Sequence, residues 1–92
     1  MVYNWIKDKI PTLSIVKQRD NGDILIVCNH DLEILYFNQT SKDIISMIDG
    51  TRTIDEIKRI MLSRYDVGEE LLELDLIDVI RDMQWKKIVY LR

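Results

Sequence analysis

The length, composition and charge of the chain indicate a small, weakly acidic globular domain. The chain has 92 residues, of which 47% are hydrophobic and 32% are charged, and its net charge is near −3. This is enough apolar material for one small core, so we expect a single domain over residues 1–92. The acidic balance argues against nucleic acid as a partner, because nucleic-acid binders usually carry a basic face.

The sequence shows no signal for a membrane. No apolar run approaches the ~20 residues that a spanning helix needs, and the N-terminus lacks the features of a signal peptide. We therefore expect a cytoplasmic protein with no membrane partner. Tyr3, Trp5 and Ile6 predict an N-terminal segment that folds over a sheet or covers a neighbouring copy, which leaves a homodimer open.

The first half of the chain predicts an antiparallel sheet. Pro11 and the alternating residues after it predict a first strand over Thr12–Gln18. The Asn21-Gly22 pair predicts a type I′ hairpin turn, because both residues readily adopt positive φ. The partner strand is then Asp23–Cys28, and after a second tight turn the chain returns as a third strand over Glu33–Phe37.

The predicted second strand is apolar on both faces. Leu25 and Val27 alternate with Ile24, Ile26 and Cys28, so neither side of this strand is polar. One side is expected to pack against the helices that follow. We expect something other than these helices to cover the second side.

The second half of the chain predicts three helices. The first is capped by Asn38 or Thr40 and stops at Gly50, which suits a left-handed conformation. The second has a capping box, Thr53-x-x-Glu56, and covers Ile54–Arg64.

The third helix has a similar box, Asp66-x-x-Glu69, and extends to about Gln84. A terminal strand or wing over Ile88–Leu91 follows. The fold class is therefore α+β: a winged helix-turn-helix with a three-stranded antiparallel sheet followed by three helices.

Candidates for catalysis and metal binding are few. The only histidine, His30, falls in a predicted turn, and the only cysteine, Cys28, falls in a predicted strand, so no activated nucleophile is expected. A single cysteine also excludes an internal disulfide and a cysteine-based metal cage. The carboxylates of the third helix are spread around it and fit a solvated face. We expect a protein that is not an enzyme and has no cofactor and no metal.

A helix-turn-helix can also bind DNA, with its last helix in the major groove. Here that helix carries six carboxylates and only Arg81 as a basic residue, so its approach to phosphate would be repulsive. The basic residues Arg81, Lys86, Lys87 and Arg92 are better explained as partners of the negative C-terminal end of this helix.

Several short motifs follow one another along the chain: Phe37-Asn38-Gln39-Thr40, Ile48-Asp49-Gly50, Thr53-x-x-Glu56-Ile57, Tyr65-Asp66-Val67 and Asp75-Leu76. In their order and spacing, these motifs resemble the PqqD-like family of recognition elements for ribosomally synthesised, post-translationally modified peptides. The match covers about residues 10–89, within an expected domain core of about residues 10–91. The sequence departs from the family pattern at Phe37 for Leu, at Gln39 for Glu, and at Lys87, where a glycine is common.

The resemblance implies a standalone chaperone that binds the leader segment of a precursor peptide and presents the peptide to a modifying enzyme. The leader is expected to add as a strand to the edge of the third predicted strand, against the third helix. The resemblance assigns backbone pairing to Ile34, Leu35, Tyr36 and Phe37. It assigns the wall of the cleft to Leu74, Ile77, Asp78 and Arg81.

Three alternatives remain open at this point. Within the family, a radical S-adenosylmethionine (SAM) enzyme is favoured as the partner over the leader peptidase of a lasso-peptide pathway. Outside the family, the fold also fits a DNA-binding winged helix, which predicts duplex affinity that falls steeply with salt. A dimerisation module without a peptide ligand is the third reading.

Overall fold

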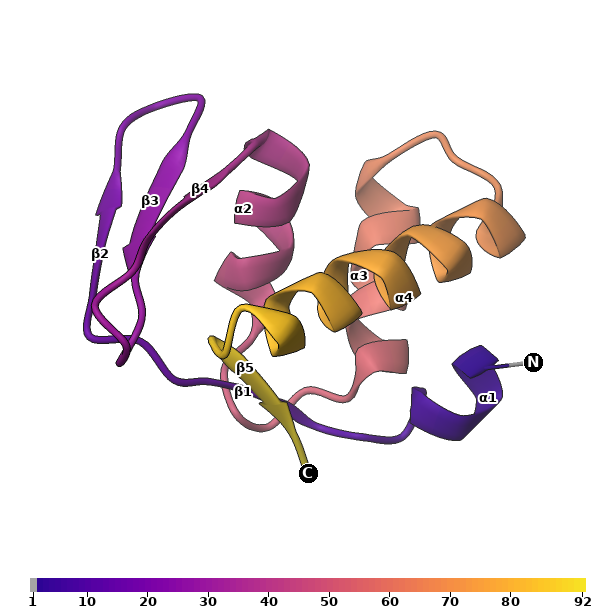
Figure 1. The fold of residues 1–92 in the computed structure, drawn as a ribbon. Coiled ribbons are helices and arrows are strands. Elements are labelled where there is room, and N and C mark those ends of the chain that lie inside the picture. Colours follow the sequence, from indigo (N-terminus) through magenta and orange to yellow (C-terminus); the bar gives the residue numbers. More distant parts are fainter. Residues whose placement is uncertain (1) are drawn as a thin grey trace.

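Four consecutive strands are followed by three consecutive helices, which confirms the predicted α+β class, with two additions at the ends of the chain. The computed structural model describes residues 2–92. Its elements are α1 (Val2–Ile6), β1 (Pro11–Leu13), β2 (Lys17–Asp20), β3 (Leu25–Cys28), β4 (Ile34–Phe37), α2 (Gln39–Met47), α3 (Ile54–Arg64), α4 (Glu69–Trp85) and β5 (Val89–Leu91). The additions are the short helix α1 and a second sheet formed by β1 and β5 (Figure 1).

The three-stranded antiparallel sheet has the order β2-β3-β4 and is covered by helices on one face only. Leu25 and Val27 of β3 and Phe37 of β4 point into the core and are buried, whereas Ile26 and Cys28 are half-buried on the outer face. No element of residues 2–92 covers the outer face in Figure 1, so the cover expected for this side of the strand is not found within the described chain.

The predicted first strand, Thr12–Gln18, is in fact two strands in two different sheets. β1 pairs with β5 and β2 pairs with β3. Backbone hydrogen bonds from Ile10 to Arg92 (3.0 Å) and from Ser14 to Ile88 (2.8 Å) hold β1 against the C-terminal end of the chain. The single alternating pattern breaks because its two halves find partners that lie far apart in the sequence.

The hairpin between β2 and β3 is confirmed, but its turn is not of type I′. Only Gly22 has positive φ, at +84°, and the Asn21 N–H donates to the Ile24 carbonyl over 2.9 Å. The Asp20 carboxylate accepts a hydrogen bond from the Gly22 N–H at 3.0 Å and another from the Lys42 ammonium group at 2.8 Å. These local bonds stabilise a turn between Asn21 and Ile24.

The start and stop signals of the first two long helices are confirmed. Asn38 caps α2 by accepting from the Ser41 N–H, and Gly50 adopts a φ of +82° after the helix ends. Both hydrogen bonds of the Thr53–Glu56 capping box are present, and α3 has the predicted bounds. Since each signal is local, the sequence alone was sufficient to locate these helix ends.

The second predicted capping box is absent. α4 begins after Gly68 without a side-chain cap. The Glu69 carboxylate instead accepts a hydrogen bond from the buried Lys58 ammonium group of α3, at 2.8 Å. Glu69, which the capping box requires, is therefore bonded to Lys58 on another helix instead of to the backbone at its own helix start.

Lys58 joins three helices and has 6% of its surface exposed. Its Nζ lies 3.0 Å from Glu73 and 3.3 Å from Asp55, besides the contact with Glu69. Burial alone would lower the pKa of Lys58, but the hydrogen bonds to these carboxylates outweigh it and raise the pKa. The Tyr3 ring of α1 lies 5.0 Å from the Lys58 Nζ. α1 thus packs on α3 and α4, not over the sheet as predicted.

The basic residues near the end of α4 have separate partners. Lys86 pairs with Asp82 of α4 at 2.8 Å, whereas Lys87 pairs with Asp31 at 2.9 Å and Arg92 donates to the Gly50 carbonyl. The basic residues as a group therefore do not all serve to offset the negative C-terminal end of α4, as the sequence had predicted. Lys87 has a φ of +62°, which explains why a glycine suits this position in the family pattern.

Candidate functional site

The two edges of the three-stranded sheet differ in character. β2 forms one edge with the sequence Lys-Gln-Arg-Asp, and all four residues are exposed. β4 forms the other edge with Ile-Leu-Tyr-Phe and carries no charge. Charged residues on an edge strand discourage pairing with another chain, and an uncharged apolar edge permits it. The β4 edge is therefore the candidate site for an added strand.

The hydrogen-bond pattern shows which backbone groups of β4 are free. Residues opposite each other in an antiparallel ladder alternate between bonded and non-bonded pairs. Asn29 and Glu33 are a bonded pair, with the Asn29 N–H donating over 3.2 Å. With Val27 opposite Leu35 in the same ladder, Leu35 and Phe37 direct their N–H and C=O groups toward β3. Ile34 and Tyr36 direct theirs to the open edge.

The side chains of β4 follow the same alternation. Leu35 packs against the core and Phe37 is buried. Ile34 and Tyr36 are 54% and 66% exposed and lie on the outer face of the sheet. All four predicted strand residues thus lie at this edge, and two of them offer both free backbone groups and exposed side chains. Their contact with a peptide stays a prediction.

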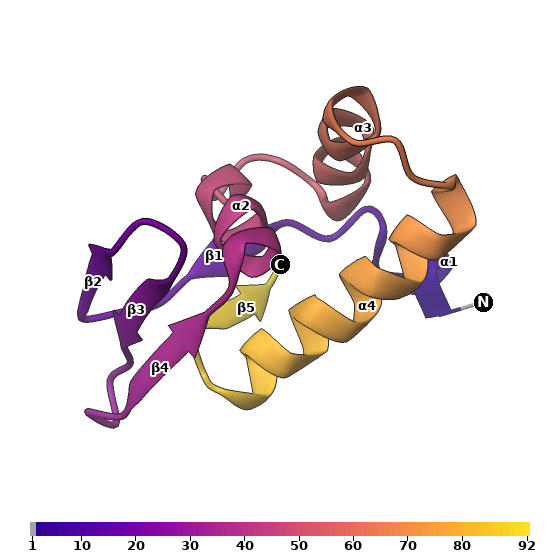
Figure 2. The ribbon, with the colours of Figure 1, turned by 90° about the horizontal axis from the view of Figure 1, so that it is seen from above.

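The C-terminal end of α4 is the part of this helix nearest β4 (Figure 2). Lys86, directly after the helix, places its Nζ 5.1 Å from the centre of the Phe37 ring and also pairs with Asp82. Asp75 shares a depression with Thr40, three residues after β4. Positions 75, 79, 82 and 86 lie on one side of a helix, so Asp75, Val79 and Asp82 line the side of α4 nearer β4.

The four predicted residues of α4 lie mainly elsewhere. Ile77 is in the core with 6% exposure, and Leu74, Asp78 and Arg81 are exposed. Asp78 borders the side nearer β4, since it is three residues from Asp75 and four from Asp82. By helical spacing, Leu74 and Arg81 lie on the neighbouring side of α4. Contact between these four residues and a peptide stays a prediction.

Hydrogen bonds of the Asn29 side chain hold β4 against the end of α4. Asn29, fully buried before the turn, donates from Nδ2 to the Lys86 carbonyl and to the Glu33 carboxylate, each at 3.0 Å. Its Oδ1 accepts from the N–H groups of Asp31 (3.0 Å) and Glu33 (2.9 Å). Because every polar atom of this side chain is satisfied, Asn29 sets the position of β4 relative to α4 at little energetic cost.

A depression lies beside Thr40, three residues after the end of β4. Its volume is about 150 Å³, and its lining consists of Thr40, Met61, Tyr65, Val67, Leu72 and Asp75. The Tyr65 hydroxyl donates to the Asp43 carboxylate, and this hydrogen bond raises the pKa of Tyr65. The lining is mostly apolar with polar groups at its border, which suits one anchoring apolar side chain.

Residues 2–92 give little support for nucleophilic catalysis or metal binding. Cys28 is half-buried on the outer sheet face, and His30 is exposed in the following turn. Within this part of the chain, no group of three histidine, cysteine or acidic residues is arranged to hold a metal ion. Of the helices that the structure describes, none has the length and apolar character needed to cross a bilayer.

Comparisons with known proteins identify the family and the fold of the chain. The sequence model of the family described as coenzyme PQQ synthesis protein D (PqqD) matches residues 27–89, which include β4 and α4. Curated proteins give no match. Among solved structures, the fold is similar to that of TbiB1 in complex with the TbiA(beta) leader peptide. The TM-score is 0.74 at 17% identity, over 84% of this chain and 94% of that one. Because the family model matches well over half of the sequence, the chain belongs to the PqqD family.

Proposed function

We propose that the protein binds the leader segment of a ribosomally made precursor peptide and presents the peptide to a modifying enzyme. The observation that carries this proposal is the uncharged β4 edge, where the backbone groups of Ile34 and Tyr36 point outward beside exposed side chains. Membership of the PqqD family and the likeness to a protein solved with a leader peptide support it.

In this proposal the leader forms a fourth strand beside β4. The N–H and C=O groups of Ile34 and Tyr36 provide up to four backbone hydrogen bonds, each contributing about 0.5 to 1.5 kcal/mol net. Successive side chains of the leader then alternate between the outer sheet face and the side of α4 that carries Asp75, Val79 and Asp82. Backbone bonds hold the strand, and these two lines of side chains select it.

The charge near the site favours a leader over nucleic acid. Asp75, Asp78 and Asp82 lie along or beside the helix side nearer β4, and only Lys86 adds a positive charge there. Phosphate would be repelled by this arrangement, whereas a basic side chain of a peptide would be attracted. We propose that leader side chains facing α4 include lysine or arginine, with an apolar anchor in the depression beside Thr40.

Calorimetric titration with the leader of the precursor encoded beside this gene tests the proposal. We expect saturable binding with a Kd of about 10 µM or lower, and no binding of a scrambled leader. A DNA duplex provides the alternative ligand, and its binding at low salt without leader binding would replace the proposal with the winged-helix reading.

For the enzyme partner we favour a radical SAM enzyme over a lasso-pathway peptidase. Modification of the precursor by the purified neighbouring enzyme, with and without this protein, separates the two. We expect a change of precursor mass without cleavage of the leader. Cleavage of the leader would instead assign the protein to a peptidase partner.

A further inference from the structure

The outer face of the three-stranded sheet is a second surface, distinct from the β4 edge. The ladder register places Lys17, Cys28 and Ile34 in one row across the sheet. A parallel row contains Arg19, Ile26 and Tyr36. Each row therefore runs from a basic residue on β2 through two residues without charge, and ends at the β4 edge.

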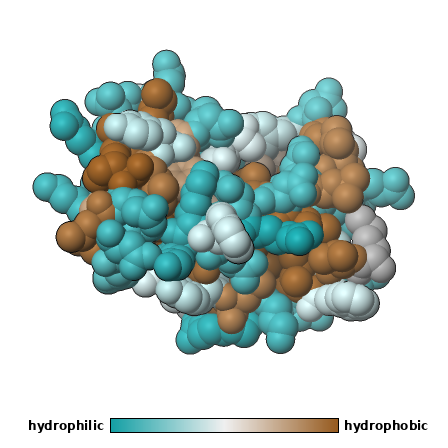
Figure 3. Space-filling model, viewed as in Figure 1, coloured by the Kyte–Doolittle hydropathy of each residue, from teal (hydrophilic) through white to brown (hydrophobic). Residues whose placement is uncertain are grey.

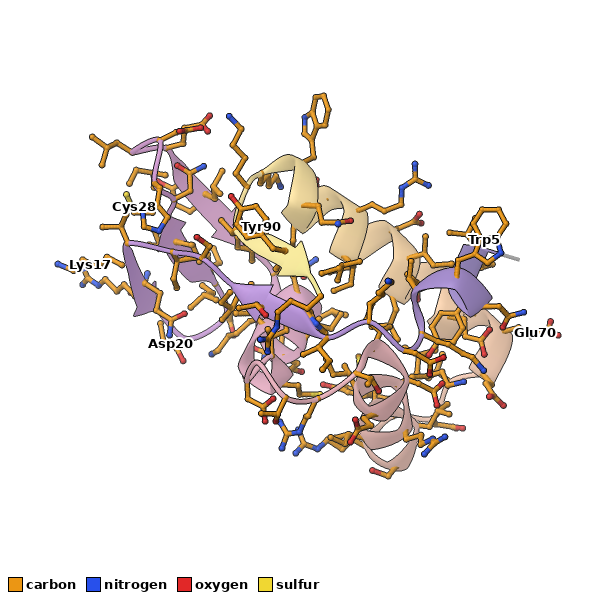
Figure 4. The ribbon with its side chains drawn as sticks, turned by 90° about the horizontal axis from the view of Figure 1, so that it is seen from below. Trp5, Lys17, Asp20, Cys28, Glu70 and Tyr90 are labelled. Atoms are coloured by element: carbon orange, nitrogen blue, oxygen red, sulfur yellow. The ribbon has the colours of Figure 1, made fainter. Side chains whose placement is uncertain are left out.

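This outer face is open and partly hollow. Lys17 and Cys28 point away from the helices in Figure 4, and Figure 3 shows apolar surface among polar atoms at this end of the molecule. A shallow depression of about 170 Å³ lies between β2 and the apolar residues Ile26, Cys28 and Ile34. Within residues 2–92 no helix packs here, although the strand carries apolar residues on this side as on the core side.

The charge at the border indicates what kind of surface fits. Neither Lys17 nor Arg19 forms an ion pair within the described chain, and both are exposed. Of the acidic residues that adjoin the sheet, Asp20 and Asp31 are paired with Lys42 and Lys87, and Glu33 accepts a hydrogen bond from Asn29. A second copy stacked face to face would add two more basic side chains and no carboxylate, because neither row contains one. An apolar patch bordered by aspartate or glutamate on another protein would complement this face.

The surface also adjoins the proposed peptide site. In a strand added to β4, the side chains opposite Ile34 and Tyr36 would project on this outer face and lengthen both rows by one residue. A partner that covers the rows would therefore contact the protein and the leader together. It would bind more tightly when the leader is present, because the completed rows offer more apolar area.

We propose that the outer sheet face is the docking site for the enzyme that modifies the precursor, through an apolar patch bordered by carboxylates. This inference rests on the proposed leader-binding function and adds the enzyme's position. It accounts for the apolar outer residues of β3, which the core does not use. It also makes enzyme recruitment depend on leader loading, so that an empty carrier competes weakly for the enzyme.

A pair of double charge reversals tests the docking site. The first variant is Lys17→Glu with Arg19→Glu, and the control is Lys9→Glu with Arg64→Glu, which changes the net charge equally at exposed positions elsewhere. The probe is the purified modifying enzyme encoded beside this gene. Its affinity for each variant is measured by calorimetry with and without saturating leader, and leader affinity is measured separately.

We expect the first variant to lose at least tenfold in enzyme affinity while its leader affinity changes less than about twofold, as for a rim charge that steers a partner. The control should retain both affinities. Equal enzyme affinity of the two variants, or no association of the wild type with the enzyme, would overturn the docking site. So would self-association in sedimentation that only the first variant loses, because a second copy would then occupy the face. Failure of the wild type to bind leader contradicts the proposed function separately.

Discussion

A proline placed at the free edge of β4 would remove one peptide contact with little damage to the sheet. Tyr36→Pro eliminates an N–H that points away from β3, so no bond within the sheet is lost. Proline is tolerated on edge strands where the N–H faces solvent, and the preceding residue, Leu35, is already extended as proline requires. The variant should therefore fold with a thermal midpoint close to that of the wild type.

The effect on leader binding follows from the hydrogen bond that is removed. A peptide carbonyl left without its donor at the edge costs about 1 to 3 kcal/mol. At 1.4 kcal/mol per tenfold change in Kd, leader affinity should fall roughly 5- to 140-fold. Tyr36→Ala separates the loss of the N–H from the loss of the phenol ring, because it removes only the ring.

The other edge of the same sheet supplies a matched control. In β2 the ladder directs the backbone groups of Arg19 toward β3 and those of Gln18 outward, so Gln18→Pro removes an equivalent free N–H. Calorimetric titration of the three variants with leader should show weakened binding for Tyr36→Pro alone, beyond any effect of the ring. Leader affinity equal in Tyr36→Pro and Tyr36→Ala, or a comparable loss in Gln18→Pro, would refute strand addition at β4.

Four further predictions concern stability and the geometry of the site. Lys58→Met should destabilise the fold by about 3 kcal/mol in urea unfolding, because carboxylates around a buried charge lose their partner, whereas the exposed Arg59→Met should cost under about 1 kcal/mol. Lys87→Gly should melt about 4 °C higher than Lys87→Ala by calorimetry, the reverse of the usual order, because φ at this position is positive. Asn29→Asp should cost about 1 to 3 kcal/mol in urea unfolding and weaken leader binding, because it replaces two donated hydrogen bonds with repulsion. Hydrogen bonds from the N–H groups of Arg52 and Thr51 lower the pKa of Asp49 to about 2, so its stabilising effect is full above pH 4 and is lost as the pH falls toward 2. Asp49→Asn, which still accepts these bonds, should show a smaller loss of stability over that range. An equal loss in both proteins would assign the acid sensitivity to other groups.

The sequence was sufficient for elements whose boundaries depend on local bonds. Asn38, Gly50 and the Thr53–Glu56 box each act within a few residues, and the structure has all three. The second box failed because Glu69 finds Lys58, eleven residues away, and no spacing rule foresees that contact. The split of the first strand has a similar cause, since β1 pairs with a strand at the opposite end of the chain.

Only the β4 side of the candidate site could be predicted from the sequence. The order of strands identifies β4 as an edge, and alternation then assigns the direction of its side chains. The inward stripe of α4 was also visible in the sequence, but which flank of that stripe faces β4 depends on how the helix is rotated and crossed over the sheet. The contact of Lys86 with Phe37 and its ion pair with Asp82 indicate that the side of α4 with Asp75 and Asp82 is nearer β4.

Hydrogen exchange of the backbone amides of β4, followed by NMR with and without leader peptide, tests the central claim most directly. In the free protein the amides of Ile34 and Tyr36 should exchange quickly and those of Leu35 and Phe37 slowly, because only the latter are bonded to β3. At saturating leader the account predicts strong new protection of Ile34 and Tyr36. Binding of the leader without any change in the exchange of these two amides would contradict it.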